Sequence, residues 1–191
     1  MEALGLAVLV GLVALGQGQP IDPHAPPFCP PLAPRDCHDV HAGGSRSDGV
    51  HLIYPGGRDG APVPVYCDMS TEGHVWTVFQ KRFNGSVSFF RGWNDYRRGF
   101  GRADGEYWLG LQTLHLLTLQ APYELRVELE DFENNSAAAT YGSFALSPRA
   151  VSAEEDGYSL HVAGFRDGGA GQPWGRTHTY GVGPTLVGWD V

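Results

Sequence analysis

The alternation of apolar and charged residues predicts one strand more clearly than any other element of the chain. From Tyr123 to Glu130, an apolar residue occupies every second position and a charged residue fills each position between them. A period of two is typical of a strand with one buried and one solvent-facing side. We therefore predict a strand over residues 123–132, in a sheet that has one wet face.

Shorter apolar alternations predict further strands along the chain. They cover residues 50–54, 63–67, 74–83, 140–147 and 157–165. In the first of them, Val50, Leu52 and Tyr54 alternate with His51 and Ile53. The sequence YPGGRDG supplies a turn after it, and the prolines around the second strand place that strand at the edge of a sheet.

Two segments favour short helices. Leu111, Leu114 and Leu117 follow helical spacing, and residues 94–100 fit one helical turn capped by Asn94. Together with the strands, these helices predict an α+β fold of mixed, mainly antiparallel sheets with short helices and long ordered loops.

An apolar run near the N-terminus predicts a secretion signal. The thirteen residues from Ala3 to Leu15 are too few to span a membrane. They fit the apolar region of a signal peptide, which we assign to residues 1–18, although no Lys or Arg precedes the run. A buried core segment is the alternative, which is less favoured because a core helix would begin at residue 3 without a cap. No later run is long enough to span a bilayer, so we expect a soluble, secreted product.

Secretion changes what the three cysteines, Cys29, Cys37 and Cys67, imply. An odd number in a secreted chain indicates one bridge and one remaining thiol, and spacing alone leaves all three pairings open. Cys29 lies in the proline-rich sequence PHAPPFCPPLAP, which keeps it extended and suited to a bridge between chains. A free thiol, or a Cys29–Cys37 pair, remains open as well.

Composition excludes some classes of function. The chain of 191 residues has room for one domain, and its formal net charge of -8 argues against a nucleic-acid binder, which would carry a basic face. With 27 glycines, 14 prolines and 12% aromatic residues, it is typical of a globular fold rich in loops.

Candidate catalytic and metal-binding residues are sparse. Asp104 and Glu106, and the cluster 154–156, offer carboxylates, but neither follows the spacing of a calcium loop. The chain has no G-x-S-x-G sequence, and its histidines are scattered. The three cysteines are also too few and too dispersed to predict a zinc site. We therefore predict no catalytic and no metal site, and a protein that is not an enzyme.

Two tripeptides predict N-linked glycosylation. Asn84-Gly85-Ser86 and Asn134-Asn135-Ser136 match the acceptor pattern without a proline in the middle. Each follows a predicted strand, a position that favours exposure. We expect a glycan on Asn84 and on Asn134.

Several longer motifs occur in a fixed order along the chain. They include VPVYCDM, EGHVWTVFQKR, VSFFRGWNDYRRGFG, GEYWLGL and YELRVELEDFE. Together they strongly resemble the fibrinogen-related domain, the C-terminal globular module of fibrinogen, ficolins, angiopoietins and tenascins. The resemblance covers about residues 28–171, and it is highly specific because several long motifs match in order.

The resemblance implies roles for the cysteines that their spacing leaves open. Cys37 and Cys67 match the first disulfide within the family's domain. Cys29 matches an N-terminal position that joins subunits in a small matrix member of the family, so the resemblance implies a disulfide-linked homo-oligomer. The rings of Trp93 and Trp108 match the family's core, which makes them scaffolding, with glycines that let loops pack against flat rings.

The resemblance also implies a division of the chain. After the signal 1–18 come a proline-rich segment 19–36, a partial fibrinogen C-terminal-like domain 37–171 and a divergent tail 172–191. The family would continue into a third subdomain that carries a calcium site and a ligand pocket, and the tail lacks their residues. We therefore expect a truncated form that has no cofactor, and in which the strand 123–132 loses cover and exposes apolar surface.

The expected function follows from the resemblance. It implies a secreted, non-enzymatic extracellular-matrix glycoprotein that contributes to elastic-fibre assembly and cell–matrix interaction, with elastin and fibrillin microfibrils as partners. The alternative is a ficolin-like innate-immune lectin that recognises acetylated or carbohydrate ligands. Ficolins carry a collagen-like G-X-Y stem, which this chain lacks.

Overall fold

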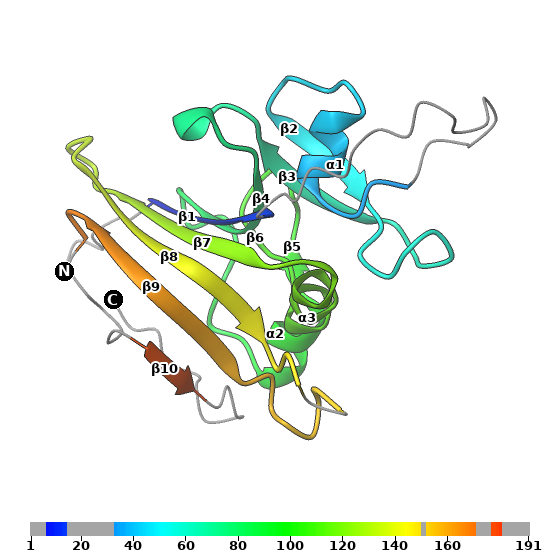
Figure 1. Ribbon diagram of the computed structural model, residues 1–191. Helices are drawn as coiled ribbons and strands as arrows, with labels where there is room; N and C mark the ends of the chain where they lie inside the picture. The colour runs from blue at the N-terminus through cyan, green and yellow to red at the C-terminus, as the bar shows by residue number, and fades with distance from the viewer. Residues whose placement is uncertain (1–6, 15–32, 150–151, 171–176, 181–191) are drawn as a thin grey trace.

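The computed structural model describes residues 7–14, 33–149, 152–170 and 177–180, and these residues are built around one large antiparallel sheet (Figure 1). Its strands follow the order β10-β9-β8-β7-β1-β4-β3-β2, with β5 and β6 attached beside β4. The strands are β1 Ala7–Ala14, β2 Gly49–Ile53, β3 Val63–Asp68, β4 Trp76–Arg82, β5 Phe100–Gly101, β6 Tyr107–Trp108, β7 Tyr123–Glu130, β8 Ser136–Leu146, β9 Leu160–Gly168 and β10 Thr177–Tyr180.

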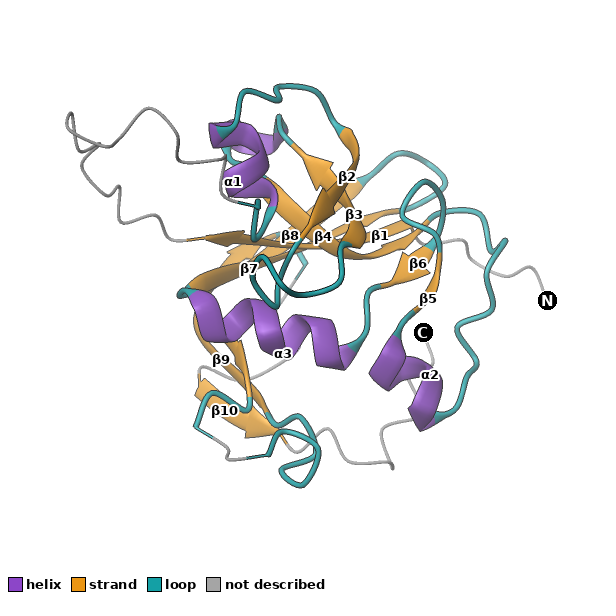
Figure 2. Cartoon of the chain, turned by 90° about the vertical axis from the view of Figure 1, so that its right-hand side faces the viewer, coloured by secondary structure: helices purple, strands orange, loops and turns teal. Residues whose placement is uncertain are grey.

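Within the described residues, three α-helices and one short 3₁₀ helix accompany the sheet. They are α1 Cys37–Ala42, η1 Thr71–Gly73, α2 Trp93–Arg98 and α3 Leu111–Gln120. Figure 2 shows α3 lying along one face of the sheet, where its Thr118 hydroxyl accepts a hydrogen bond from the Leu146 backbone N–H at 3.2 Å. The predicted α+β class, with mainly antiparallel strands and short helices, is confirmed.

The strand and helix with the clearest patterns lie where the sequence predicts them. In β7, Tyr123 and Leu125 are buried, while Val127 and Leu129 are half-buried. Within β7 the apolar side therefore keeps at least partial cover from the core, contrary to expectation, whereas Phe132, in the predicted strand 123–132 but beyond the end of β7, is 69% exposed as expected. In α3, the leucines at 111, 114 and 117 are all buried, as their spacing predicts.

Two local expectations are wrong. In β2, Ile53 is fully buried, whereas Val50 and Leu52 are 44% and 53% exposed. Among the described strands, β2 is the last on its side of the sheet and pairs with one neighbour, β3. Helix α2 begins after Gly92, which takes the N-cap position in place of Asn94 and makes no side-chain cap hydrogen bond.

The apolar run assigned to the signal peptide contributes the central strand β1. It pairs with β7 over its whole length, from Ala7 opposite Glu130 to Ala14 opposite Tyr123, and with β4 on its other edge. The segment 172–191, expected to diverge, contributes β10, which pairs antiparallel with β9. Whether residues 1–18 act as a cleaved signal stays a prediction.

A disulfide and a capped helix fix the first part of the domain to the core. Cys37 and Cys67, the pair that the family resemblance implies, form a disulfide with a Cα–Cα distance of 5.5 Å, and both are fully buried. Asp36 caps α1 by accepting the Asp39 backbone N–H at 3.0 Å. Its other oxygen accepts the Tyr123 hydroxyl at 2.7 Å. Burial, with the nearby Asp36, raises the pKa of Tyr123, so this hydroxyl remains a donor.

The ring-rich stretch is packed as scaffolding. Trp108 donates its indole N–H to the Tyr96 carbonyl at 2.7 Å, and the two rings lie 5.6 Å apart. Gly99 makes this packing possible: its φ is +94°, and a Cβ there would lie 2.6 Å from the Leu109 carbonyl oxygen. A side chain at this position would collide with the backbone of the next segment.

A buried carboxylate fixes the loop that follows β4. Glu106, only 2% exposed, accepts backbone N–H groups from the loop 83–87 at 2.7–2.9 Å. Its second oxygen also accepts the Ser86 hydroxyl at 3.2 Å. Burial would raise the pKa of Glu106, but the backbone hydrogen bonds outweigh it and lower the pKa to about 2.

We expect the Cys37→Ala/Cys67→Ala double variant to lose stability. The bridge joins residues 30 apart in sequence, and closing such a loop contributes roughly 3–4 kcal/mol in the chain-entropy model. Replacing both cysteines avoids mispairing with Cys29. Chemical denaturation monitored by tryptophan fluorescence measures this loss of stability. A denaturation midpoint that is unchanged in both the double variant and the reduced parent would contradict the prediction.

We expect stability to fall in acid through Glu106. Its folded pKa of about 2 lies below the ordinary 4.5, so its contribution is fully present above pH 4.5 and is lost as pH falls toward 2. The shift corresponds to roughly 3 kcal/mol. Glu106→Gln should remove this part of the pH dependence, whereas Glu133→Gln, on the exposed surface, should retain it. The measurement is the free energy of unfolding at a series of pH values from neutral to pH 3. If it falls by the same amount in the parent and in Glu106→Gln, this assignment is refuted.

Candidate functional site

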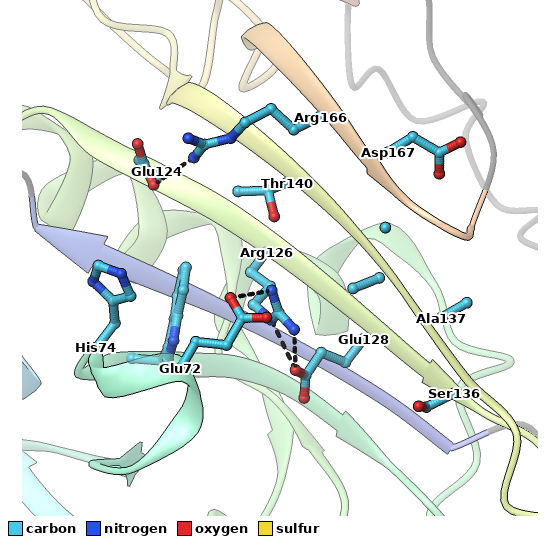
Figure 3. Close-up of a pocket in the computed structure, with 13 residues that line it drawn as sticks. Glu72, His74, Glu124, Arg126, Glu128, Ser136, Ala137, Thr140, Arg166 and Asp167 are labelled. Atoms are coloured by element: carbon cyan, nitrogen blue, oxygen red, sulfur yellow. Dashed lines mark hydrogen bonds and ion pairs between the residues drawn. The ribbon is translucent and has the colours of Figure 1, made fainter.

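A charged groove of about 470 Å³ lies on the polar face of β7, β8 and β9 and is bounded by the loop around η1 (Figure 3). Its walls carry four carboxylate side chains, Glu72, Glu124, Glu128 and Asp167, and two guanidinium groups, Arg126 and Arg166. His74 and Trp76 also line the groove. With histidine neutral, the charges of the groove sum to an acidic surface.

Arg126 is the central side chain of this groove. Its guanidinium group lies 2.9 Å from the Glu72 carboxylate and 2.7 Å from Glu128, and its side chain is only 13% exposed. It therefore joins the η1 loop to β7, as Figure 3 shows. An arginine held between two carboxylates in a shallow groove is fixed in orientation and largely neutralised.

A second ion pair lies across the sheet from the first. Arg166 on β9 contacts Glu124 on β7 at 3.1 Å. Thr140 on β8 lies opposite both Arg126 and Arg166, so the three side chains form one row across the strands. This pairing is possible because residues directly opposite in antiparallel strands point to the same face.

The sequence of β7 places the charges of the groove. Because successive residues of a strand face opposite sides, burial of Tyr123 and Leu125 puts Glu124, Arg126 and Glu128 on the other face. Gly168 then lets β9 approach β8 closely, since a Cβ there would lie 2.8 Å from the Ala138 carbonyl oxygen. The groove therefore follows from the strand register together with one small residue.

The structure does not bring the predicted site residues together. Cys37 and Cys67 are buried in the core and do not line the groove. Cys29 lies outside the described residues. Asn84 and Asn134 are both exposed, on separate loops after β4 and β7. Asn84 sits in the loop that Glu106 holds, and its side-chain oxygen accepts the Ser86 backbone N–H at 3.0 Å.

The remaining carboxylates that the sequence singled out have structural partners. Asp104 forms an ion pair with Arg102 at 2.7 Å on the surface. Glu154 contacts Arg97 at 2.7 Å, and Asp156 accepts the Ser147 hydroxyl at 2.6 Å. Two of the three carboxylates of the cluster 154–156, those of Glu154 and Asp156, thus have partners within the protein.

Two further observations hold for the part of the chain that the structure describes. Within it, no three His, Cys, Asp or Glu side chains gather where they could hold a metal ion. No helix in that part is long and apolar enough to cross a membrane.

The groove was missed from sequence, although one signal for it was present. The charged alternation of β7 predicted a wet face, but it could not say which residues of β8, β9 and η1 would lie beside it. Those neighbours are set by register and by the path of the loop 71–76, which sequence patterns do not give.

Comparison with known sequences places these features in a family. The family described as "Fibrinogen beta and gamma chains, C-terminal globular domain" matches residues 33–191. Microfibril-associated glycoprotein 4 of Homo sapiens is 74% identical over 138 residues, which cover 72% of this chain and 54% of that protein. Fibrinogen C domain-containing protein 1 of Homo sapiens is 56% identical over 129 residues, 68% of this chain and 28% of that protein. The chain thus spans about half or less of the length of these relatives.

Solved structures agree with the sequence comparison. The fibrinogen-like globe domain of human ANGPTL6 is 40% identical with a TM-score of 0.64, covering 72% of this chain and 59% of that one. The lamprey fibrin D-dimer, solved with the peptide Gly-His-Arg-Pro-amide, is 39% identical with a TM-score of 0.64, covering 74% and 43%. From the matched residues, the fold and the Cys37–Cys67 bridge, the chain belongs to the family of fibrinogen C-terminal globular domains.

Proposed function

We propose that this chain is an extracellular-matrix glycoprotein of the microfibril-associated type, which binds matrix proteins and has no catalytic activity. The observation that carries the proposal is the 74% identity to microfibril-associated glycoprotein 4 over 138 residues. The match covers 72% of this chain rather than a short motif. Identity at this level supports a shared surface as well as a shared fold.

The acidic groove is the surface that we assign to matrix binding. Its carboxylates on Glu72 and Glu124 are 61% and 20% exposed, so an incoming cation can reach them beside the fixed Arg126. Such a surface suits basic segments of elastin and of fibrillin microfibrils, the partners that the family resemblance implies. Charge complementarity of this kind sets orientation and association rate and weakens with salt.

Secretion, glycosylation and assembly complete the proposal. A secreted chain would carry glycans on Asn84 and Asn134, and both side chains are exposed. It would form disulfide-linked homo-oligomers through Cys29. Oligomers would present several grooves at once, which raises avidity for a repetitive fibre without any new contact.

We expect Glu72→Gln/Glu124→Gln to weaken binding to immobilised tropoelastin or fibrillin. Each substitution removes one groove carboxylate, so the dissociation constant should rise roughly two- to tenfold at low salt. Glu130→Gln/Glu133→Gln, which makes the same charge change on exposed residues outside the groove, is the matched control. Surface plasmon resonance over a salt series measures both.

Equal affinity of the two double variants would remove the groove from the proposal but leave the matrix function standing. Absence of any binding by the parent would contradict the matrix function itself. Calcium-dependent retention on acetylated resin, without binding to matrix proteins, would favour the lectin alternative.

We expect two glycans on the secreted chain. Treatment with peptide N-glycosidase should shift its electrophoretic mobility, and Asn84→Gln and Asn134→Gln should each abolish one step of that shift. The double variant should migrate like the enzyme-treated parent. A parent chain whose mobility the enzyme leaves unchanged would show that neither site is used.

A further inference from the structure

The loop 83–87 places an asparagine directly before a glycine, and both residues are exposed. An asparagine side chain can react with the backbone nitrogen of the next residue, because the attack closes a small ring. A side chain on that next residue hinders the attack, and glycine has none. Gly85 also lies in open space, since a Cβ there would meet no atom within 4 Å. Asn84 therefore has the neighbour that hinders this reaction least, and water can reach it.

The reaction consumes water and releases ammonia. The backbone nitrogen of Gly85 attacks the side-chain carbonyl carbon of Asn84, and a new C–N bond forms. The side-chain nitrogen of Asn84 leaves as ammonia, carrying the proton that the Gly85 nitrogen loses. Water then opens the resulting succinimide ring on either side, which leaves aspartate or isoaspartate in place of asparagine. No oxidant, reductant or enzyme is required.

The fold activates the carbon that is attacked. The Asn84 side-chain oxygen accepts the Ser86 backbone N–H at 3.0 Å. A hydrogen bond to a carbonyl oxygen stabilises the negative charge that develops on it when a nucleophile adds to the carbon. The Ser86 N–H therefore stands where an oxyanion donor stands in acyl transfer.

The same loop restrains the nitrogen that attacks. The Gly85 N–H donates to the Glu106 carboxylate at 2.9 Å, and the same oxygen accepts the N–H groups of Phe83 and Asn84 at 2.7 and 2.8 Å. The attacking nitrogen has to give up its proton, and a buried negative charge in contact with it makes the deprotonated form costly. These charge-assisted hydrogen bonds also fix the backbone on both sides of the nitrogen.

We propose that Asn84 is a site of spontaneous deamidation in every copy that carries no glycan there, and that Glu106 is the group that slows this reaction in the folded protein. A glycan on Asn84 would occupy the side-chain nitrogen that has to leave. Among the described residues, Glu106 supplies the carboxylate that contacts the Gly85 nitrogen. The proposal goes beyond the matrix function and does not depend on it.

Deamidation would keep the loop from closing again. Isoaspartate carries the backbone through its former side chain, which adds one carbon to the path between residues 84 and 85. The N–H groups of the loop converge on Glu106 at 2.7–2.9 Å, so an added carbon puts them out of register. Aspartate at position 84 would instead place a second negative charge in the same loop. Either product also removes the acceptor for a glycan.

The second glycan acceptor provides an internal reference. Asn134 is followed by Asn135, whose side chain hinders attack by its own backbone nitrogen. The Asn135 N–H is also held by a carboxylate oxygen, that of Asp131 at 2.9 Å. Asn134 should therefore stay intact during the period in which a released Asn84 reacts.

The test follows the full chain, produced without glycans in an oxidising cytoplasm and incubated in neutral buffer. Brief trypsin digestion at slightly acidic pH yields the peptide Phe83–Arg91. Chromatography with mass spectrometry separates its asparagine, aspartate and isoaspartate forms, and the synthetic peptide 83–91 gives the rate without the fold. We expect the folded chain to deamidate at Asn84 about ten- to a hundredfold more slowly than the peptide, as loss of a hydrogen bond to a charged group implies.

Two variants distinguish a local effect from a general loss of stability. Glu106→Gln should deamidate at Asn84 about as fast as the peptide. Cys37→Ala/Cys67→Ala, which is destabilised elsewhere and keeps Glu106, should stay as slow as the parent while circular dichroism shows it folded. Equal rates in these two variants would overturn the proposal, as would equal conversion of Asn84 and Asn134. A folded parent that reacts as fast as the peptide would overturn it even if Glu106→Gln does not fold.

Discussion

The backbone hydrogen bonds of β1 to both β4 and β7 are the interaction on which the continuity of the sheet depends. On one side stand β2, β3 and β4 with the Cys37–Cys67 bridge, and on the other stand β7, β8 and β9 with the charged groove. Within the described residues, other links between the two sides are side-chain contacts, such as that of Asp36 with Tyr123. Among the described strands, β1 is the one that joins the backbone ladders of these two sides.

This constraint reaches the groove directly. Gly11 of β1 lies opposite Arg126, and the space it leaves is taken by Trp76 beside the groove. Arg126 in turn connects β7 to the η1 loop through Glu72. The charged groove and the central strand are therefore parts of one arrangement, so a change in β1 would alter the surface that we assign to matrix binding.

Much of the architecture could be predicted from local pattern, but its centre could not. The alternation of β7 and the leucine spacing of α3 each carry their own periodicity, and both elements lie where they were expected. The run of residues 3–15 has no such period, because a central strand is buried on both sides and resembles a signal peptide in composition. Its place in the sheet depends on β4 and β7, which lie far away in sequence.

The candidate site was less accessible to sequence reasoning for a similar reason. Glu106 looked like a possible acid or metal ligand, yet its role is set by backbone N–H groups of the loop 83–87, which no residue pattern reports. The groove likewise needs three strands in register. The family resemblance supplied the disulfide pair, but it did not supply the surface chemistry of β7, β8 and β9.

The hydrogen bond between Ser86 and Glu106 has a consequence for the order of events during synthesis. Ser86 is the hydroxyl residue that makes Asn84 an acceptor, and in the fold its hydroxyl donates to a carboxylate 20 residues further along the chain. Before Glu106 has emerged from the ribosome, the Ser86 hydroxyl has no such partner, and the loop is free to bind in the active site of the enzyme that transfers the glycan. Any sugar on Asn84 would therefore be attached to the nascent chain, before the loop closes over its carboxylate.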